Sequence, residues 1–194
     1  MYNIFTTLAL TLVPDLNEKE LKAIEKKFIP RVLKKGEHFL KAGETANELA
    51  FICKGVMRTY VTLEDNIEAT NNFAFENMIC SSAASMIGQT PSVESVQAVE
   101  PCELLVIKTE DLEYLYQKYH RCERLGRMMI ERLLIEQDNR LRWFIEKNAQ
   151  QRYDSFIEYF SEKHHRIPKY LVASYLGITP ESLSRLRKGQ KNEQ

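Results

Sequence analysis

The residues whose types and spacing best suit a chemical task lie near the end of the chain, in YLVASYLGITPESLSRLRK, residues 170–188. Apolar residues occupy one side of a first helical segment, and Gly177 can take the left-handed conformation that ends a helix. Thr179 can cap a following helix, and Pro180 suits its first position. A helix-turn-helix needs a small residue, a glycine turn and an apolar plug before a polar helix. We therefore predict a helix-turn-helix that reads DNA.

The outward face of the second helix carries side chains that suit base edges and phosphates. Arg185 can bind guanine through two hydrogen bonds, and Glu181 can accept one from cytosine N4. Lysine and arginine around them can neutralise phosphates. The predicted DNA-binding residues are Lys169, Thr179, Pro180, Glu181, Ser182, Ser184, Arg185, Arg187 and Lys188.

The distribution of charge agrees with an anionic partner at this end. The chain has no net charge, since 27 lysines and arginines balance 27 aspartates and glutamates. Residues 163–192 nevertheless contain seven basic residues and a single acid, Glu181. A basic end on an acidic body favours a partner such as nucleic acid. A basic helix that only contacts solvent is the alternative that charge alone leaves open.

A long helix is predicted over residues 121–147, and its apolar pattern suggests a dimer. One short reading helix contacts too few base pairs for specificity, whereas two copies one DNA turn apart contact enough. Residues at alternating four- and three-residue steps form a short coiled-coil seam. Packing of this helix within one chain is the alternative. Gln137 in the seam has two interpretations: it sets the register of the two helices, which we favour, or it contacts a ligand. The seam residues are Ile130, Leu134, Gln137, Leu141 and Phe144.

The part of the chain before this helix changes from a helical to a β pattern. Asn17 and Glu20 have the spacing of a capping box at the start of a helix. After Pro30, short apolar runs separated by glycines predict a compact β-roll or barrel. The apolar run 96–107 closes the roll, and Thr109 is predicted to cap the helix that follows.

The predicted fold class is α+β, in three parts. Residues 1–120 form an N-terminal β-roll of the jelly-roll type. Residues 121–148 form the dimerisation helix, and residues 149–194 form the helical DNA-binding domain with its helix-turn-helix.

Several functional classes are disfavoured by composition. No apolar run approaches the ~20 residues that span a bilayer, and the N-terminus lacks the basic start of a signal peptide, so we expect a cytoplasmic protein without a membrane partner. His38 is the single histidine of the predicted roll, which argues against a cupin-like metalloenzyme on that roll. We therefore predict no catalytic residues, no metal site and no certain cofactor. The cysteines form no CxxC pair and are expected to be buried thiols: Cys53, Cys80, Cys102 and Cys122.

Three segments resemble the CRP/FNR family of bacterial transcription regulators. They are KKGEHFLKAGETANELAFICKGVMR at 34–58, CELLVI followed by TEDL at 102–112, and ASYLGITPESLSR at 173–185. The resemblance covers residues 14–188 and implies a homodimeric, non-enzymatic regulator that binds double-stranded DNA and RNA polymerase. No cysteine precedes Cys53, which disfavours the iron–sulfur sensing found in part of this family. Of the family's three base-reading positions, two match at Glu181 and Arg185, whereas Pro180 replaces an arginine, so the preferred DNA sequence should differ.

The resemblance also implies an effector site, but its phosphate-binding residues are missing. Cyclic-nucleotide-binding members have a Gly-Glu pair and an Arg-Ser or Arg-Thr pair in the stretch that corresponds to residues 75–100. Here Glu76-Asn77 is the nearest pair to the first, Pro91-Ser92 or Ser92-Val93 stands at the second, and the stretch contains no lysine or arginine. A buried phosphate without a cation costs several kcal/mol. We therefore predict that cAMP and cGMP do not bind tightly.

Another small molecule could use the same site, and its identity is unknown. By the resemblance, Gln137 and Asp138 of the long helix fall where family members touch the nucleotide base. Arg58 in the roll is not a ready substitute for the missing arginine. The candidate effector residues are Arg58, Glu76, Asn77, Ser92, Gln137 and Asp138. A sensor whose C-terminal helices bind a protein instead of DNA is the alternative function, and a steep salt dependence of DNA binding separates the two.

Overall fold

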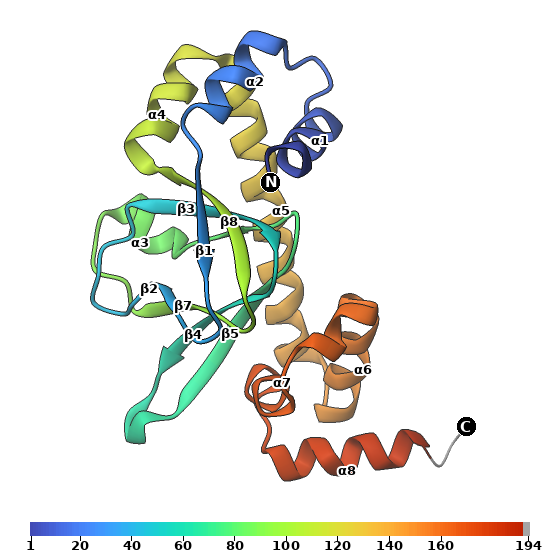
Figure 1. Ribbon diagram of the computed structural model, residues 1–194. Helices are drawn as coiled ribbons and strands as arrows, with labels where there is room; N and C mark the ends of the chain where they lie inside the picture. Colours follow the sequence, from blue (N-terminus) through green and yellow to red (C-terminus); the bar gives the residue numbers. More distant parts are fainter. Residues whose placement is uncertain (192–194) are drawn as a thin grey trace.

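A computed structural model describes the backbone of residues 1–191 and the side chains of residues 1–187. Two four-stranded antiparallel sheets face one another and form the β-roll (Figure 1). The strand orders are β1-β8-β3-β6 and β2-β7-β4-β5. The strands are β1 Ile29–Leu33, β2 His38–Leu40, β3 Glu48–Lys54, β4 Met57–Thr62, β5 Glu68–Ala74, β6 Ile79–Cys80, β7 Glu94–Ala98 and β8 Cys102–Lys108.

Alternation of side chains along the strands separates two cores. Ala50 and Ile52 of β3 point into the roll, where they pack with Met57 and Leu104 between the two sheets. Phe51 points to the opposite face and packs with Phe5 and other residues of the surrounding helices. One face of β3 therefore closes the roll and the other anchors the helices.

Gly55 makes the tight turn between β3 and β4 possible. Its φ is +108°, and a Cβ placed there would lie 2.6 Å from Cys102 Sγ and 2.8 Å from the carbonyl oxygen of Pro101. No side chain fits this space, so the turn requires glycine.

Helices gather at both ends of the roll, and α5 runs along it from one group to the other (Figure 1). The first group consists of α1, α2 and α4, and the second of α6, α7 and α8. The helices are α1 Tyr2–Leu12, α2 Glu18–Glu25, α3 Ala83–Gly88, α4 Thr109–Lys118, α5 His120–Glu146, α6 Ala149–Phe160, α7 Lys169–Leu176 and α8 Pro180–Lys191, with short 3-10 turns η1 Glu64–Asn66 and η2 Ser161–Arg166.

A third apolar core joins the C-terminal helices to the roll. Phe73 and Phe75 of the roll contact Phe160 of α6 and Tyr175 of α7, with ring centroids 5.3 Å apart for Phe75–Phe160 and 5.2 Å apart for Phe73–Tyr175. Phe156, at the centre of this cluster, is fully buried. The C-terminal helices are therefore docked on the roll rather than tethered to it by α5 alone.

The predicted fold class is confirmed: a β-roll, a long helix and C-terminal helices follow one another along the chain. The long helix begins and ends within one residue of its predicted bounds. The capping box of Asn17 and Glu20 is present at the start of α2. No helix in the described residues is long and apolar enough to cross a bilayer.

The predicted cap at Thr109 is wrong. The N-cap of α4 is Lys108, and Thr109 is the first residue of the helix. The backbone N–H of Thr109 donates to the Asn47 carbonyl at 2.9 Å, which continues the pairing of β8 with β3 up to the helix start. Thr109 Oγ1 is buried and has no hydrogen-bond partner among the described residues.

Candidate nucleic-acid interface and candidate effector cavity

The predicted helix-turn-helix is formed by α7 and α8. Gly177 ends α7 in the left-handed conformation with φ +66°, and the Ile178 N–H then donates to the Ala173 carbonyl at 3.0 Å. Thr179 caps α8, since its hydroxyl accepts from the Ser182 N–H at 3.2 Å. Pro180 takes the first helical position, where its missing N–H is not needed.

One side of α8 is anchored and the other faces solvent. Leu183 is only 2% exposed and belongs to the core shared with the roll. The predicted DNA-binding residues divide accordingly. Exposed side chains belong to Lys169, Thr179, Pro180, Glu181, Ser184 and Arg185, half-buried ones to Ser182 and Arg187, and the side chain of Lys188 lies outside the described residues.

Glu181 and Arg185 lie four residues apart on the exposed face of the first half of α8. The pKa of Glu181 is lowered, first by a hydrogen bond with its own backbone N–H and then by one with Thr179. The carboxylate therefore stays ionised and can act as a hydrogen-bond acceptor. Figure 1 shows α8 at the end of the molecule opposite α1 and α2, with its outer side uncovered.

Arg166, part of the basic segment, is neutralised within the chain. Its guanidinium contacts the Glu76 carboxylate at 2.6 and 2.9 Å and also pairs with Glu100. Burial alone would raise the pKa of Glu76, but hydrogen bonds from Arg166 and the Gly55 N–H overcome this and lower the pKa to about 2. Arg166 therefore ties the C-terminal helices to the roll and is not available for phosphate.

Two further contacts fasten α7 to the edge of the roll. The Ser174 hydroxyl donates to the Glu68 carbonyl and accepts from the Thr70 N–H, both at 2.8 Å. It therefore satisfies backbone groups at the open edge of β5 that a neighbouring strand would otherwise bind. Arg140 of α5 donates to the carbonyls of Thr70 at 3.1 Å and Tyr175 at 3.3 Å. These contacts join α5, β5 and α7 at one point.

Arg58, a candidate effector residue, lies on the outer face of its sheet. Its neighbour Met57 points into the roll, and the alternation of β4 turns Arg58 away from the interior. The guanidinium is 2.5 Å from the Glu68 carboxylate, donates to the Gln97 side chain at 2.6 and 3.0 Å, and stacks 4.1 Å from the Tyr60 ring centre. It is therefore paired with side chains of its own sheet, on the face directed away from the roll interior.

The remaining candidate effector residues are spread over the molecule. Asn77 is exposed in a turn with φ +70°, and Ser92 is buried with its hydroxyl donating to the Glu94 carbonyl at 2.8 Å. Gln137 is half-buried on α5, and the exposed Asp138 pairs with Arg142 at 2.9 Å. Among the candidates, Asn77 lines a small cavity of about 90 Å³ and none lines the large one.

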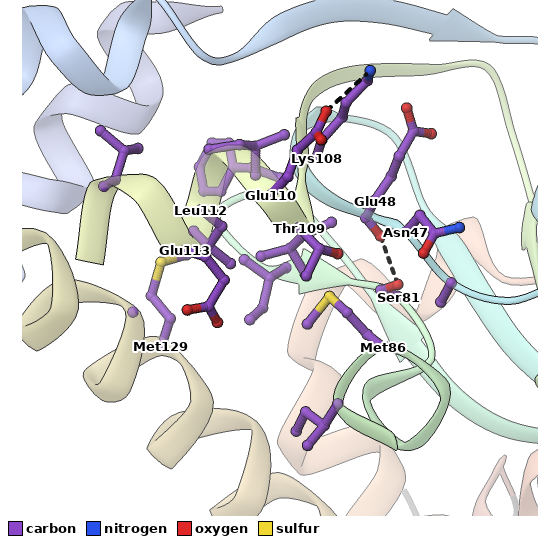
Figure 2. Close-up of a pocket in the computed structure, with 18 of the residues that line it drawn as sticks. Asn47, Glu48, Ser81, Met86, Lys108, Thr109, Glu110, Leu112, Glu113 and Met129 are labelled. Carbon is purple, nitrogen blue, oxygen red and sulfur yellow. Dashed lines mark hydrogen bonds and ion pairs between the residues drawn. The ribbon is translucent and has the colours of Figure 1, made fainter. Parts of the chain in front are cut away.

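The large cavity measures about 1050 Å³ and was not predicted. It lies between the start of β3, α3, and the helices α4 and α5, with α1 and α2 behind it (Figure 2). Its lining comes from segments more than 100 residues apart, and each contributes a few ordinary apolar or polar side chains. No local sequence signal marks such a site. The nearest trace of it in the sequence is the apolar stripe Cys122, Leu125 and Met129 of α5, which by itself predicts only a buried helix face.

The cysteines and acidic residues form no metal site in the described part of the chain, where no group of three or more ligand side chains converges. All four cysteines are free and buried. Burial raises the pKa of Cys80 to about 12 and the pKa values of Cys102 and Cys122 to about 11, so these thiols stay protonated at neutral pH.

Comparison with protein families matches residues 30–119 to the cyclic nucleotide-binding domain. The matched range begins in β1 and ends after α4, so it covers the roll. Among curated proteins, the fumarate nitrate reduction regulatory protein of Klebsiella oxytoca is 29% identical over 187 residues, covering 88% of this chain and 72% of the relative. The similarity to this relative therefore extends beyond the roll into the helices.

Two solved structures share the fold over most of the chain. FixK2 from Bradyrhizobium japonicum aligns with a TM-score of 0.75 at 16% identity, over 86% of this chain and 85% of FixK2. A putative transcriptional regulator of the crp/fnr family from Eubacterium rectale aligns with a TM-score of 0.71 at 19% identity, over 94% of this chain and 87% of that one. At these identities the likeness concerns the fold.

Proposed function

We propose that the chain is a DNA-binding transcription regulator of the CRP/FNR type. In this proposal it acts as a homodimer whose two α8 helices read neighbouring turns of duplex DNA. The observation that carries the proposal is the exposed first half of α8, held by the buried Leu183 and presenting Glu181 and Arg185 together. Helix-turn-helix proteins place this part of the second helix in the major groove.

The second half of α5 supports a homodimer. Leu134 and Leu141 of the predicted seam are 67% and 58% exposed in the single chain, and Ile130 and Phe144 are 36% and 39% exposed. Apolar side chains repeated along one helix face are typical of a surface that a second helix covers. We propose that a second copy of the same chain covers them, with Gln137 setting the register.

The family membership also guides the choice of partners and location. Relatives of this chain are regulators rather than enzymes. We propose that the protein works in the cytoplasm and contacts RNA polymerase when bound to DNA. Because Pro180 stands where the family reads bases with arginine, we expect its preferred DNA sequence to differ from the usual family site.

Selection of bound sequences from random duplex DNA tests the central proposal. We expect a two-fold symmetric site with half-sites one helical turn apart, and an affinity that falls steeply as salt rises. Arg185→Ala should cost about 1–3 kcal/mol and relax the preference at one base pair of each half-site, whereas Lys169→Ala should weaken all sequences alike and reduce the salt slope by about 1 per protomer. Glu64→Gln, on the β4–β5 turn, is the matched control and should change neither property.

The proposal fails if the protein binds duplex DNA no better than background in dilute buffer, or if the selected sites lack symmetry. A salt-independent partner captured through α7 and α8 would instead favour the protein-binding alternative. The two outcomes differ in salt dependence, because only neutralised phosphates release counterions.

Cyclic nucleotides are not expected to act as the effector. Arg58 is turned away from the roll interior and paired with Glu68, and the Ser92 hydroxyl is used within its own turn. A cyclic phosphate would therefore meet no free cation among these candidates. We expect excess cAMP to raise the melting temperature by less than about 1 °C, and a rise of several degrees would contradict this.

A further inference from the structure

We propose that the large cavity between β3, α3, α4 and α5 binds a small, largely apolar molecule that is uncharged or carries a positive charge. The proposal concerns ligand binding alone, so it can be tested without DNA. Its basis is the size of the cavity, its apolar floor and the sign of charge at its rim.

The cavity has the size and floor of a small-molecule site. Its volume of about 1050 Å³ matches the pockets of roughly 300–1,000 Å³ that hold drug-sized ligands. The floor is made by buried apolar side chains from the roll and from four helices. They are Phe5, Ile24, Phe28, Phe51, Ile107, Leu115, Cys122 and Leu125. An apolar body placed there would be removed from water.

Acidic side chains dominate the rim. Four carboxylates and one ammonium group line the cavity. The ammonium group of Lys108 lies 3.4 Å from the Glu110 carboxylate, as Figure 2 shows. The remaining three are Glu44, Glu48 and Glu113.

Two of these carboxylates have no cationic partner. Glu48 is held by both guanidinium nitrogens of Arg31, at 2.7 and 2.8 Å, whereas Glu44 accepts a backbone N–H from Lys41. Glu113 has neither a hydrogen bond nor an ion pair to any described residue, and Figure 2 shows it on the same side of the cavity as Met129. A negatively charged ligand would be repelled here, and a positive one attracted.

Thr109 lines the cavity at the start of α4. Its hydroxyl is buried and has no partner among the described residues, which is costly in a protein interior. The same burial keeps this hydroxyl out of contact with anything bound in the cavity, so Thr109 shapes the wall rather than holding the ligand.

The cavity also touches the helix that carries the dimer seam. Gly126, Met129 and Ile130 of α5 line it, and Ile130 is the first residue of the predicted seam. A ligand that packs against these residues would change the position or mobility of α5 where the seam begins. Occupancy of the cavity is therefore connected to the dimer through a single continuous helix.

Three probes with one apolar body and different charge test the ligand class: 2-naphthylmethanol, 2-naphthylmethylammonium and 2-naphthoate. Binding to the full chain is measured by isothermal titration calorimetry at low ionic strength. We expect the alcohol and the ammonium to bind, and the carboxylate to bind at least about fivefold more weakly than the alcohol, because exposed charges contribute modestly. Met129→Trp should obstruct the cavity beside α5 and weaken the binding of all three probes severalfold.

Glu113→Lys tests the charge argument at an exposed position that does not affect folding of the core. This variant should bring 2-naphthoate to at least the affinity of the alcohol and weaken the ammonium severalfold. Glu64→Lys makes the same change of charge at the tip of the β4–β5 hairpin and should leave the order of the three probes unchanged.

The proposal is overturned if 2-naphthoate binds the unmodified chain as well as the alcohol does. It is also overturned if Glu113→Lys leaves the order unchanged, or if none of the probes binds at millimolar concentration. None of these results would bear on DNA binding, which is measured separately.

Discussion

The two halves of α5 have the same kind of apolar stripe but different surroundings. In the first half, Cys122 and Leu125 are 3% and 4% exposed, packed against the roll and α1, α2 and α4. In the second half, Leu134, Leu141 and Ile145 are 67%, 58% and 73% exposed. One chain therefore completes the packing of the first half only. The apolar stripe of α5 therefore stabilises the fold of one chain in its first half and, in our proposal, the dimer in its second half.

The cavity and the proposed dimer seam meet at the junction between the two halves of α5. The large cavity reaches α5 from Cys122 to Ile130, and the seam begins at Ile130. Beyond it, Arg140 ties the second half to β5 and α7. In our proposal, a change at the cavity and a change at α8 can thus both act through α5.

The largest effect is expected from placing a charge in the exposed half. Leu141→Asp would bury an unpaired carboxylate in the dimer seam, which should weaken dimerisation by about 3–5 kcal/mol and DNA binding with it. Sedimentation of the variant should show monomers at micromolar concentration, with an unchanged far-UV circular dichroism spectrum. If the variant remains a dimer, the second half of α5 is not the interface.

Truncation in the packed half should affect folding instead. Leu125→Ala leaves a cavity in the core beneath α5 and should lower the free energy of unfolding by about 2–4 kcal/mol. Leu134→Ala is the matched control, and should lower it by less than about 1 kcal/mol at concentrations where the chain is monomeric. Urea unfolding measures both, and equal losses would erase the contrast between the halves.

Acid should loosen the C-terminal helices without the involvement of α5. The pKa of Glu76 is lowered from 4.5 to about 2 by its pairing with Arg166, so protons bind the unfolded chain more tightly than the folded one. The contribution of this pair is present above the unfolded pKa and is lost as pH falls from about 4.5 to 2.

Allowing for solvent screening of the half-buried pair, the loss from Glu76 should be on the order of 1–2 kcal/mol. Glu76→Gln removes the titrating group and should flatten this part of the stability-against-pH curve measured by urea unfolding. An unchanged curve would show that Arg166 and Glu76 do not stabilise the docking.

The smallest effect is expected at Asp138. Its ion pair with Arg142 joins two side chains of α5 that are 54% and 63% exposed. Asp138→Asn should change the unfolding free energy by less than about 0.5 kcal/mol. A change above 1 kcal/mol, seen in dimers but absent in Leu141→Asp monomers, would place Asp138 in the interface.

The parts of the fold that the sequence predicted correctly depend on interactions between residues close in the chain. The capping box of Asn17 and Glu20, the left-handed Gly177 and the length of α5 all arise from contacts within a few residues. The prediction that Thr109 caps α4 was wrong because of a contact with a distant segment. The Thr109 N–H donates to the Asn47 carbonyl, which extends the strand pairing to the start of the helix.

The site residues were only partly accessible to the same reasoning. The exposed face of α8 follows from helical periodicity, because Leu183 faces inward and Glu181 and Arg185 face outward. The partners of Arg166 could not be foreseen, since Glu76 lies 90 residues earlier in the chain.

The sequence by itself determined the order of the elements, their ends and which helix faces are apolar, because these properties come from local hydrogen bonds and side-chain periodicity. Tertiary structure alone decided which apolar faces are covered, which charges are neutralised and where a cavity remains. Those outcomes require segments far apart in the chain to meet. A leucine on α5 is therefore buried in the core or left exposed depending on which segments pack beside it.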